Sequence, residues 1–325
     1  MHRDSLWEAV VEKSQPRYVS VEEFDDIFKR VCNWGKWGPD DEKGTLNYIT
    51  AEHVRGAARL VRSGRSVSLA IPINKTAGPD NPNPPAHYMV RSHDLPVPQG
   101  EPRFAVDYLA SVCHGDCHTH IDALCHISYK GKLYNGKPAC SVASNGPTLQ
   151  DIAAYAQGIV GRGVLLDLPK LRGVKWLEPG EAVTANELAA AEAAQGVRLG
   201  EGDILVFRTG HHRRRVEIGP WRSDYDGEGR AGLHVTAIPL LYERRVSAFL
   251  PDGDGETVPC NVEGMSYPIH ALQIAAMGMC AADSLQLEEL VAACEEEQRY
   301  EFMVVLAPLR LPQGTGSLFN PIALF

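Results

Sequence analysis

The chain has 325 residues, of which 44% are hydrophobic and 22% are charged, and its formal net charge is -9. This is the composition of a compact globular protein, and the length is sufficient for a sizeable buried core. Because the phosphates of nucleic acids repel a chain of this net charge, the composition argues against a nucleic-acid partner.

The opening residues MHRDSLWEAVVEK are charged and lack the apolar segment of a secretory signal. No apolar stretch approaches the ~20 residues that a membrane helix needs. In this context the eight cysteines are interpreted as reduced thiols rather than as a disulfide framework. We therefore expect a cytoplasmic protein with no membrane partner.

The first third of the chain predicts two helices, a strand and a long loop. Apolar residues in 20–33 follow the spacing of an amphipathic helix, and Thr50 is a suitable cap for a second helix that ends at Gly64. Residues 66–73 alternate as a half-buried strand does. Residues 75–103 are crowded with proline and polar residues, which predicts a long loop with little regular structure. Such a loop can be a lid, an interface arm or a surface excursion without a role.

Strands and helices then alternate to the end of the chain. Thr184 and Glu187 form the spacing of a capping box at the start of an alanine-rich helix. Apolar runs predict strands at 163–168, 203–208, 246–250 and 301–309, and helices are expected at 238–245 and 283–297. This order favours an α/β fold, with a mixed β-sheet core and flanking helices. No linker is evident, so we expect a single domain over 1–325 with an N-terminal helical arm.

Residues 111–129, SVCHGDCHTHIDALCHISY, concentrate histidines and aspartates. Five ionisable side chains stand at every second position: His114, Asp116, His118, His120 and Asp122. In an extended strand all five would share one face, because side chains alternate across a strand. Imidazoles and carboxylates are ligand types suited to zinc and related divalent ions. Burying these groups unpaired would cost on the order of several kcal/mol each, while a metal ion would satisfy them together. A solvent-exposed polar strand face is the alternative.

The cysteines near this segment have a simpler interpretation. Cys113 and Cys117 are at odd positions, so in the same strand they would face away from the histidines. Core packing is the preferred role. A cysteine nucleophile paired with a neighbouring histidine is an alternative.

The motif resembles the signature of the cyclase-like metal-dependent hydrolases, a family that includes bacterial kynurenine formamidase and isatin hydrolase. The family pattern is His-x-Gly-Thr-His-x-Asp-x-Pro-x-His, and Thr119, His120, Asp122 and His126 match it. Asp116 stands where the first histidine is expected. The segments at 33–50, 60–73, 161–169, 202–210 and 307–325 also resemble family landmarks in order. The resemblance implies a swivelling β/β/α-type fold over nearly the whole chain.

The resemblance also implies roles for the motif residues. His120 and Asp122 would bind a divalent metal ion, Zn²⁺ or Mn²⁺, and Asp122 could bridge two ions. Asp116 or His118 would replace the missing histidine. His126 would be the general base and acid, a role that suits an imidazole because its ordinary pKa lies near working pH.

Family members take two further ligands from the region after the RTG segment, at places that we align near Asp224 and Thr236. Neither residue preserves the family ligand, so His234 is the candidate substitute, and a helix-end histidine that binds no metal is the equal alternative. His270 is assigned a cap or a supporting role.

The implied activity is hydrolysis of an amide or lactone, of the aryl formamide, cyclic imide or lactone type, on a small-molecule substrate. Trp37, Tyr129 and Arg208 are candidates for substrate binding, although packing or a structural salt bridge would explain each of them. The resemblance implies a homodimer or homotetramer. A metal-dependent lyase or isomerase and a non-catalytic ligand-binding protein are the alternative functions.

Overall fold

A computed structural model describes residues 17–94 and 102–325. The opening segment MHRDSLWEAVVEK lies outside the described residues, and so does part of the segment 75–103. None of the helices in the described part of the chain combines the length and the apolar character that crossing a bilayer requires.

A nine-stranded mixed sheet forms the centre of the molecule, in the order β1-β15-β13-β7-β9-β11-β12-β4-β14. Its four central strands pair in parallel: β7 (Ile159–Asp167), β9 (Ile204–Arg208), β11 (Ala248–Pro251) and β12 (Cys280–Asp283). Antiparallel strands extend both edges: β1 (Ser66–Ser68), β15 (Ile322–Leu324) and β13 (Glu301–Leu306) on one side, β4 (His120–Asp122) and β14 (Gly316–Leu318) on the other. The predicted α/β fold with a mixed sheet is confirmed.

The sheet is buried on both faces, which explains why its central strands are continuous apolar runs. Leu165 of β7 and Val206 of β9 lie in one core with residues of α8 (Glu288–Glu297). Their neighbours Val164 and Leu205 lie in a second core with residues of α1 (Val21–Val31) and α4 (Ala185–Gln195). Alternate residues of each strand therefore hold helices on opposite faces.

Helix caps follow the sequence closely at two sites. Thr50 caps α2 (Ala51–Ala58), and Thr184 with Glu187 forms the capping box of α4. Helix α2 ends earlier than expected, because the N–H groups at Leu60 and Val61 donate three residues back in tight turns. The N–H groups at Ser63 and Gly64 then donate to the carbonyl of Phe325. The helix expected from residue 283 begins at Glu288, because the residues before it form β12 and its connection.

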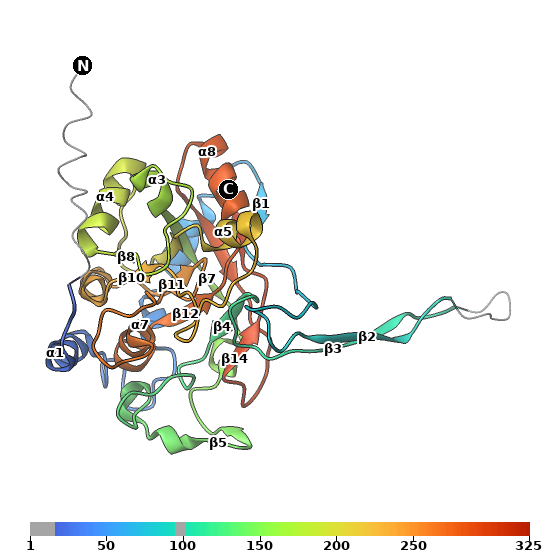
Figure 1. The fold of residues 1–325 in the computed structure, drawn as a ribbon, viewed down its shortest axis with the longest axis horizontal. Coiled ribbons are helices and arrows are strands. Elements are labelled where there is room, and N and C mark those ends of the chain that lie inside the picture. Colours follow the sequence, from blue (N-terminus) through green and yellow to red (C-terminus); the bar gives the residue numbers. More distant parts are fainter. Residues whose placement is uncertain (1–16, 95–101) are drawn as a thin grey trace.

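The segment 75–103 was expected to have little regular structure, and this expectation is wrong for Ala86–Arg91, which form a strand. Strands β2 (Ala86–Arg91) and β3 (Val106–Ala110) pair as an antiparallel hairpin, which we call the arm. The arm stands away from the rest of the molecule (Figure 1). The aromatic and β-branched residues around Tyr88 and Tyr108 favour strands, and these two rings stack across the pair at 5.0 Å.

The remaining elements are short. The helices are α3 (Leu168–Arg172), α5 (His211–Ile218), α6 (Ile238–Glu243) and α7 (Pro268–His270), which a π-helical segment, Ala271–Ala276, continues. Single 3₁₀ turns occupy Gly44–Tyr48, Tyr134–Gly136, Ala139–Ser141, Ile152–Tyr155 and Val235–Ala237. Two-residue strands β5 (Val142–Ala143), β6 (Gly146–Pro147), β8 (Ala182–Val183) and β10 (Gly232–Leu233) form small separate ladders.

Candidate metal site

Strand β4 lies between β12 and β14, and this pairing places three acidic or imidazole groups together. The antiparallel register sets Asp283 of β12 directly opposite His120 of β4. His120 Nδ1 lies 2.8 Å from the carbonyl oxygen of His118, which can only accept a hydrogen bond, so Nδ1 carries the proton. The lone pair on His120 Nε2 then faces Asp122 Oδ1 at 3.7 Å and Asp283 Oδ2 at 3.8 Å.

Asp122 belongs to two groups whose geometry could hold a metal ion. One consists of His120, Asp122 and Asp283, the other of His114, Asp122 and His126, and within each group the ligand atoms lie within 4.8 Å of one another. His114 Nδ1 is 2.9 Å from Asp122 Oδ1, and His126 Nε2 is 3.9 Å from Asp122 Oδ2. Asp122 is the residue that the two groups share, so its carboxylate would help to hold an ion in either of them.

The surroundings of Asp122 favour a cation there. The residue is only 1% exposed, and among the described residues neither of its carboxylate oxygens accepts a hydrogen bond of good geometry. Burial opposes its negative charge, but His126, His114 and His120 together hold the pKa of the carboxyl below its usual range. A buried carboxylate without donors is costly, and a metal ion would satisfy both oxygens.

His114 reaches this site because a glycine makes room for its ring. A Cβ at Gly316, on β14, would lie 2.6 Å from the His114 ring and 2.8 Å from the carbonyl of Ile121. His114 Nε2 is held by Thr315 Oγ1 at 3.0 Å, and the ring stacks on His126 at 3.8 Å between centroids.

His126 lies at the rim of the site with its side chain 27% exposed. Burial lowers the pKa of its imidazole to about 4, against the opposing effect of Asp122. A neutral imidazole at the edge of a buried site can accept a proton from a molecule that enters it.

His270 completes the ring of side chains around Asp122. Its Nε2 lies 3.3 Å from Asp283 Oδ2 and 4.0 Å from Asp122 Oδ2. Burial opposes protonation of His270, but its hydrogen bonds to Asp283 and Glu256 hold the pKa well above the ordinary value. Burial also raises the pKa of Asp283. A metal ion in this position would compete with the proton that the imidazole and the carboxylate share.

The expectation of one extended strand over 114–122 is wrong. Only His120–Asp122 is a strand, and the residues before it form bends and turns. The shared face therefore extends to His120 and Asp122 alone, while His114 arrives from the preceding turn. Cys117 also lies outside this strand, so the prediction that it faces away from the histidines on the same strand has no basis.

Three of the residues expected to bind the metal have other partners. Asp116 pairs with Arg230 at 3.0 Å and accepts a hydrogen bond from Ser223 at 2.6 Å. Although burial opposes the charge of Asp116, these two partners lower its pKa. His118 Nε2 contacts the carbonyl of Asn74 at 3.2 Å, and burial lowers the pKa of His118.

His234 lies apart from these groups as well. Its Nδ1 is 2.7 Å from Thr236 Oγ1, and its Nε2 is 3.0 Å from the carbonyl of Arg17. Within the described residues, neither metal-ligand group contains Asp116, His118 or His234. The structure thus brings together His120, Asp122 and His126 of the expected set.

The residues expected to bind substrate make structural contacts. Trp37 packs edge-on against Tyr48, with 5.1 Å between ring centroids. Tyr129 donates a hydrogen bond to Asp25 and packs its ring against the side chains of α1. Arg208 is 3% exposed and pairs with Asp167 at 2.8 Å and with Glu288 at 2.9 Å.

The sequence interpretation did not select His114, His270 and Asp283 as ligands. His114 was on the expected strand face, so the alternation of ionisable residues was a signal for it. His270 and Asp283 come from the region beyond the places assigned to the missing ligands near Asp224 and Thr236. Only the pairing of β12 with β4 identifies Asp283.

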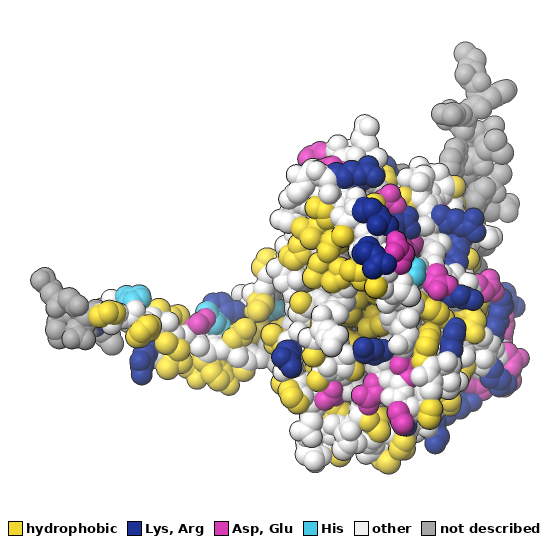
Figure 2. Space-filling model, turned by 180° about the vertical axis from the view of Figure 1, so that it is seen from behind, with side chains coloured by type: hydrophobic (Ala, Val, Ile, Leu, Met, Phe, Trp, Pro, Cys, Tyr) yellow, Lys and Arg dark blue, Asp and Glu magenta, His cyan; other side chains and the backbone are white. Residues whose placement is uncertain are grey.

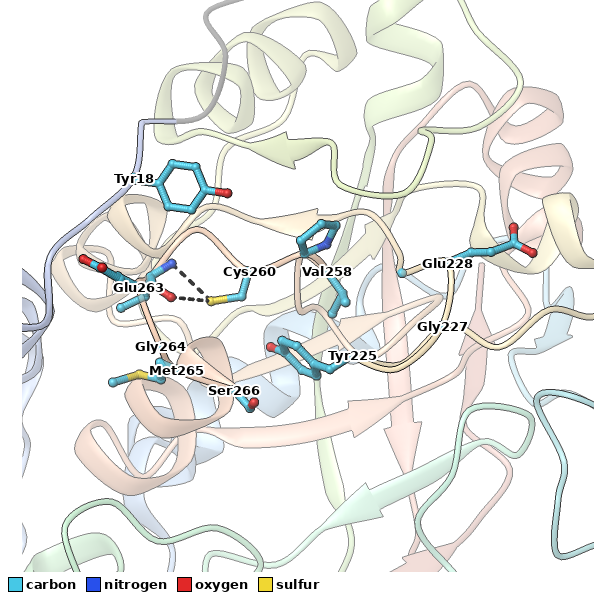
Figure 3. A pocket seen from close by; sticks show the side chains of 13 residues that line it. Tyr18, Tyr225, Gly227, Glu228, Val258, Cys260, Glu263, Gly264, Met265 and Ser266 are labelled. Atoms are coloured by element: carbon cyan, nitrogen blue, oxygen red, sulfur yellow. Dashed lines mark hydrogen bonds between the residues drawn. The ribbon is translucent and has the colours of Figure 1, made fainter.

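A surface pocket of about 460 Å³ is lined by Tyr18 and by residues of the segments 225–229 and 258–266 (Figure 3). Tyr267 lies between the pocket wall and the site. The centroid of its ring is 5.1 Å from that of Tyr225 and 5.9 Å from that of His270. Cys260 also faces this pocket, with its Sγ in hydrogen bonds to the backbone of Val262 (Figure 3).

Comparisons with known proteins give a consistent result. Residues 67–254 match the family model described as "Putative cyclase". A crystal structure described as a novel cyclase is 33% identical, with a TM-score of 0.80, and the match covers 92% of this chain and 99% of that chain. None of the curated proteins with which the chain was compared matches it.

Two isatin hydrolases share the fold at lower identity. One, bound to the product analogue thioisatinate, is 20% identical with a TM-score of 0.57, and the match covers 85% of this chain and 99% of that chain. Isatin hydrolase A from Labrenzia aggregata, bound to benzyl benzoate, is 20% identical with a TM-score of 0.56, covering 84% and 97% of the two chains.

Proposed function

The chain belongs to the cyclase family, and from this premise we propose that it is a metal-dependent hydrolase that opens an amide or lactone bond. The observation that carries the proposal is Asp122, a buried carboxylate that faces four imidazoles and a second carboxylate and that, within the described residues, accepts no hydrogen bond of good geometry. The hydrolase names of the structures that share the fold favour the same class.

The residues present fit a divalent ion. His120, Asp122 and Asp283 would hold it, and His114 and His270 lie close enough to Asp122 to complete its ligands. Mixed imidazole and carboxylate ligands accept Zn²⁺ and Mn²⁺. Once bound, such an ion lowers the pKa of a coordinated water toward neutrality and polarises the scissile carbonyl.

His126 would carry the proton through the reaction. Its neutral Nε2 accepts a proton from the attacking water as the bond between the water oxygen and the carbonyl carbon forms. The same nitrogen then returns the proton to the departing nitrogen or oxygen as the carbon–nitrogen or carbon–oxygen bond breaks. Aryl formamides, cyclic imides and lactones are the substrates that this sequence of steps would suit.

Elemental analysis of the purified protein tests the proposal first. We expect near-stoichiometric zinc or manganese in the unaltered protein and its loss in Asp122→Asn. His234→Asn is a matched control that should keep the metal, because His234 lies outside both ligand groups. If the protein neither contains nor takes up a divalent ion, the proposed chemistry is wrong.

Hydrolysis in ¹⁸O-labelled water provides the second test. A hydrolase incorporates one labelled oxygen into the acid that it releases from a formamide, imide or lactone. Metal-dependent turnover without label uptake would identify a lyase or isomerase. Metal binding without turnover of any of these substrate classes would favour a ligand-binding protein.

We also propose that the arm packs against a second copy of the chain. Every residue of β2 and four of the five residues of β3 are exposed, and Tyr88, Met89 and Leu109 are each half-exposed. Figure 2 shows hydrophobic side chains along much of the described part of the arm, with charged and histidine side chains between them. An isolated two-stranded hairpin is marginally stable in water, and contiguous apolar surface marks interaction sites. A symmetric homo-oligomer would cover both arms at once.

A further inference from the structure

Glu256 stands directly behind His270, and it is completely buried, with 0% of its surface exposed. Its carboxylate accepts three hydrogen bonds from one short segment. Oε1 accepts from the backbone N–H of His270 at 2.8 Å and lies 2.9 Å from His270 Nδ1. Oε2 accepts from the backbone N–H of Ile269 at 3.1 Å.

These contacts fix both the tautomer and the direction of the His270 ring. Because a carboxylate accepts hydrogen bonds, His270 Nδ1 is the nitrogen that carries the proton. The other ring nitrogen, Nε2, points at Asp283 and Asp122, so a metal ion that displaces the proton shared with Asp283 would take the lone pair of this nitrogen. We infer that Glu256 is a positioning residue of the metal site, which holds the His270 imidazole in the orientation and tautomer that bind the ion. This inference rests on the proposed function.

The backbone on the other side of His270 is also constrained. Tyr267 adopts a positive φ of 57°, which is uncommon for a residue with a side chain, and its N–H donates to Tyr225 Oη at 2.8 Å. The chain therefore enters α7 at a fixed angle. His270 is held from the backbone by Tyr267 and from its ring by Glu256.

Glu256 is itself anchored. Its backbone N–H donates to Asp254 Oδ1 at 3.0 Å, and the other oxygen of Asp254 pairs with the buried Arg230 at 2.8 Å. Arg230 also pairs with Asp116, in the motif segment, at 3.0 Å. The residue that supports His270 is thus joined through Arg230 to the segment that supplies His114 and His120.

A role for Glu256 in folding alone is the competing explanation, because its carboxylate also binds two backbone N–H groups. Metal affinity separates the two roles. A purely structural carboxylate changes the free energy of unfolding, while a positioning carboxylate changes the affinity of the folded protein for the ion.

The experiment measures Zn²⁺ affinity by competition with a chromogenic chelator in the unaltered protein and in Glu256→Gln. The amide cannot accept from all three donors and removes the negative charge that favours the Nδ1–H form. Loss of a carboxylate that orients a metal-binding imidazole weakens metal affinity by about 10–100-fold, and we expect a loss in this range.

Asp252→Asn is the matched control. Asp252 is also buried, lies four residues earlier in the same loop, and accepts hydrogen bonds from the backbone at Thr209, Gly210 and His211. It belongs to neither metal-ligand group found in the described residues. We expect this variant to lose thermal stability and to keep its affinity for zinc.

A double-mutant cycle with His270→Ala excludes a general effect on the fold. If Glu256 acts through His270, Glu256→Gln should cause no further loss of zinc affinity in the His270→Ala background. Should Glu256→Gln fail to fold, Glu256→Asp keeps the charge and shortens the reach to the ring, and its affinity should fall in the same direction.

The outcomes separate this inference from the proposal on which it rests. Unchanged zinc affinity in a folded Glu256 variant, with zinc bound tightly by the unaltered protein, overturns the positioning role and leaves the metal site intact. Equal losses in the presence and absence of His270 also overturn it. An unaltered protein that binds no zinc refutes the metal site itself.

Discussion

Removal of the Asp283 carboxylate is a direct test of the candidate site, because only the pairing of β12 with β4 places this residue beside His120. Asp283→Asn preserves the size of the side chain and replaces an anionic ligand with a neutral amide. Asp283 also contacts His270 at 3.3 Å, so the melting temperature of the metal-free variant will change for reasons unrelated to metal. The informative quantity is therefore the rise in melting temperature on addition of zinc.

The size of this rise follows from binding linkage and the length of the chain. An ion present at 100 times its dissociation constant stabilises the folded state by about 2.7 kcal/mol. Unfolding entropy near 60 °C is about 2.1 cal/mol/K per residue, so a chain of 325 residues has about 0.7 kcal/mol/K. The expected rise for the unaltered protein is about 4 °C. If Asp283→Asn weakens binding about 100-fold, the same zinc concentration gives only about 0.4 kcal/mol, a rise below about 1 °C.

Differential scanning calorimetry with and without zinc, after treatment with a chelator, measures this difference. His234→Asn should retain the full rise of the unaltered protein. An equal rise in Asp283→Asn and in the unaltered protein would refute the assignment of Asp283 as a ligand. The absence of any rise in the unaltered protein, at every zinc concentration, would refute the site as a whole.

Three other predictions test neighbouring parts of the structure. Burial lowers the pKa of His211 to about 3, so the unfolded chain binds more protons between about pH 6.5 and 3, and the free energy of unfolding should fall as the pH falls through this window. Urea unfolding at several pH values should show a weaker acid dependence in His211→Gln. Arg208→Met leaves Asp167 buried without its partner and should cost about 3–5 kcal/mol in urea unfolding, with unchanged zinc affinity. Replacing Tyr88 and Tyr108 together by serine should lower the mass measured by light scattering to that of one chain, and an unchanged oligomer would contradict the role of the arm.

The features that could be predicted from the sequence are those set by neighbouring residues. The apolar run at 163–168 predicts a strand, and the structure confirms it as part of β7. The capping box of Thr184 and Glu187 requires only a three-residue spacing, and it forms at the start of α4. The strands of the arm were not predicted, because each is stabilised by pairing with the other. Tyr88 and Tyr108 are partners in this pairing although they are far apart in the sequence.

The motif segment was predictable only where its strand is paired on both sides. The alternation argument holds for His120 and Asp122, because β4 is fixed between β12 and β14. It fails for Asp116, because this residue lies in the turns before β4, where its carboxylate pairs with Arg230. A pattern with a period of two therefore indicates a shared face only within the length of the actual strand.

The position of Asp283 in the site depends on the register between β12 and β4, which no local sequence pattern specifies. A shift of one residue between β12 and β4 would turn Asp283 to the opposite face and separate it from His120. His270 reaches the same place from a helix end that Glu256 holds. The motif therefore supplies one half of the ligands and the folded C-terminal half of the chain supplies the other. Because the two halves meet only in the native sheet, zinc should bind the folded state far more tightly than the unfolded chain, and the binding energy should add to the stability of the sheet at β4 and β12.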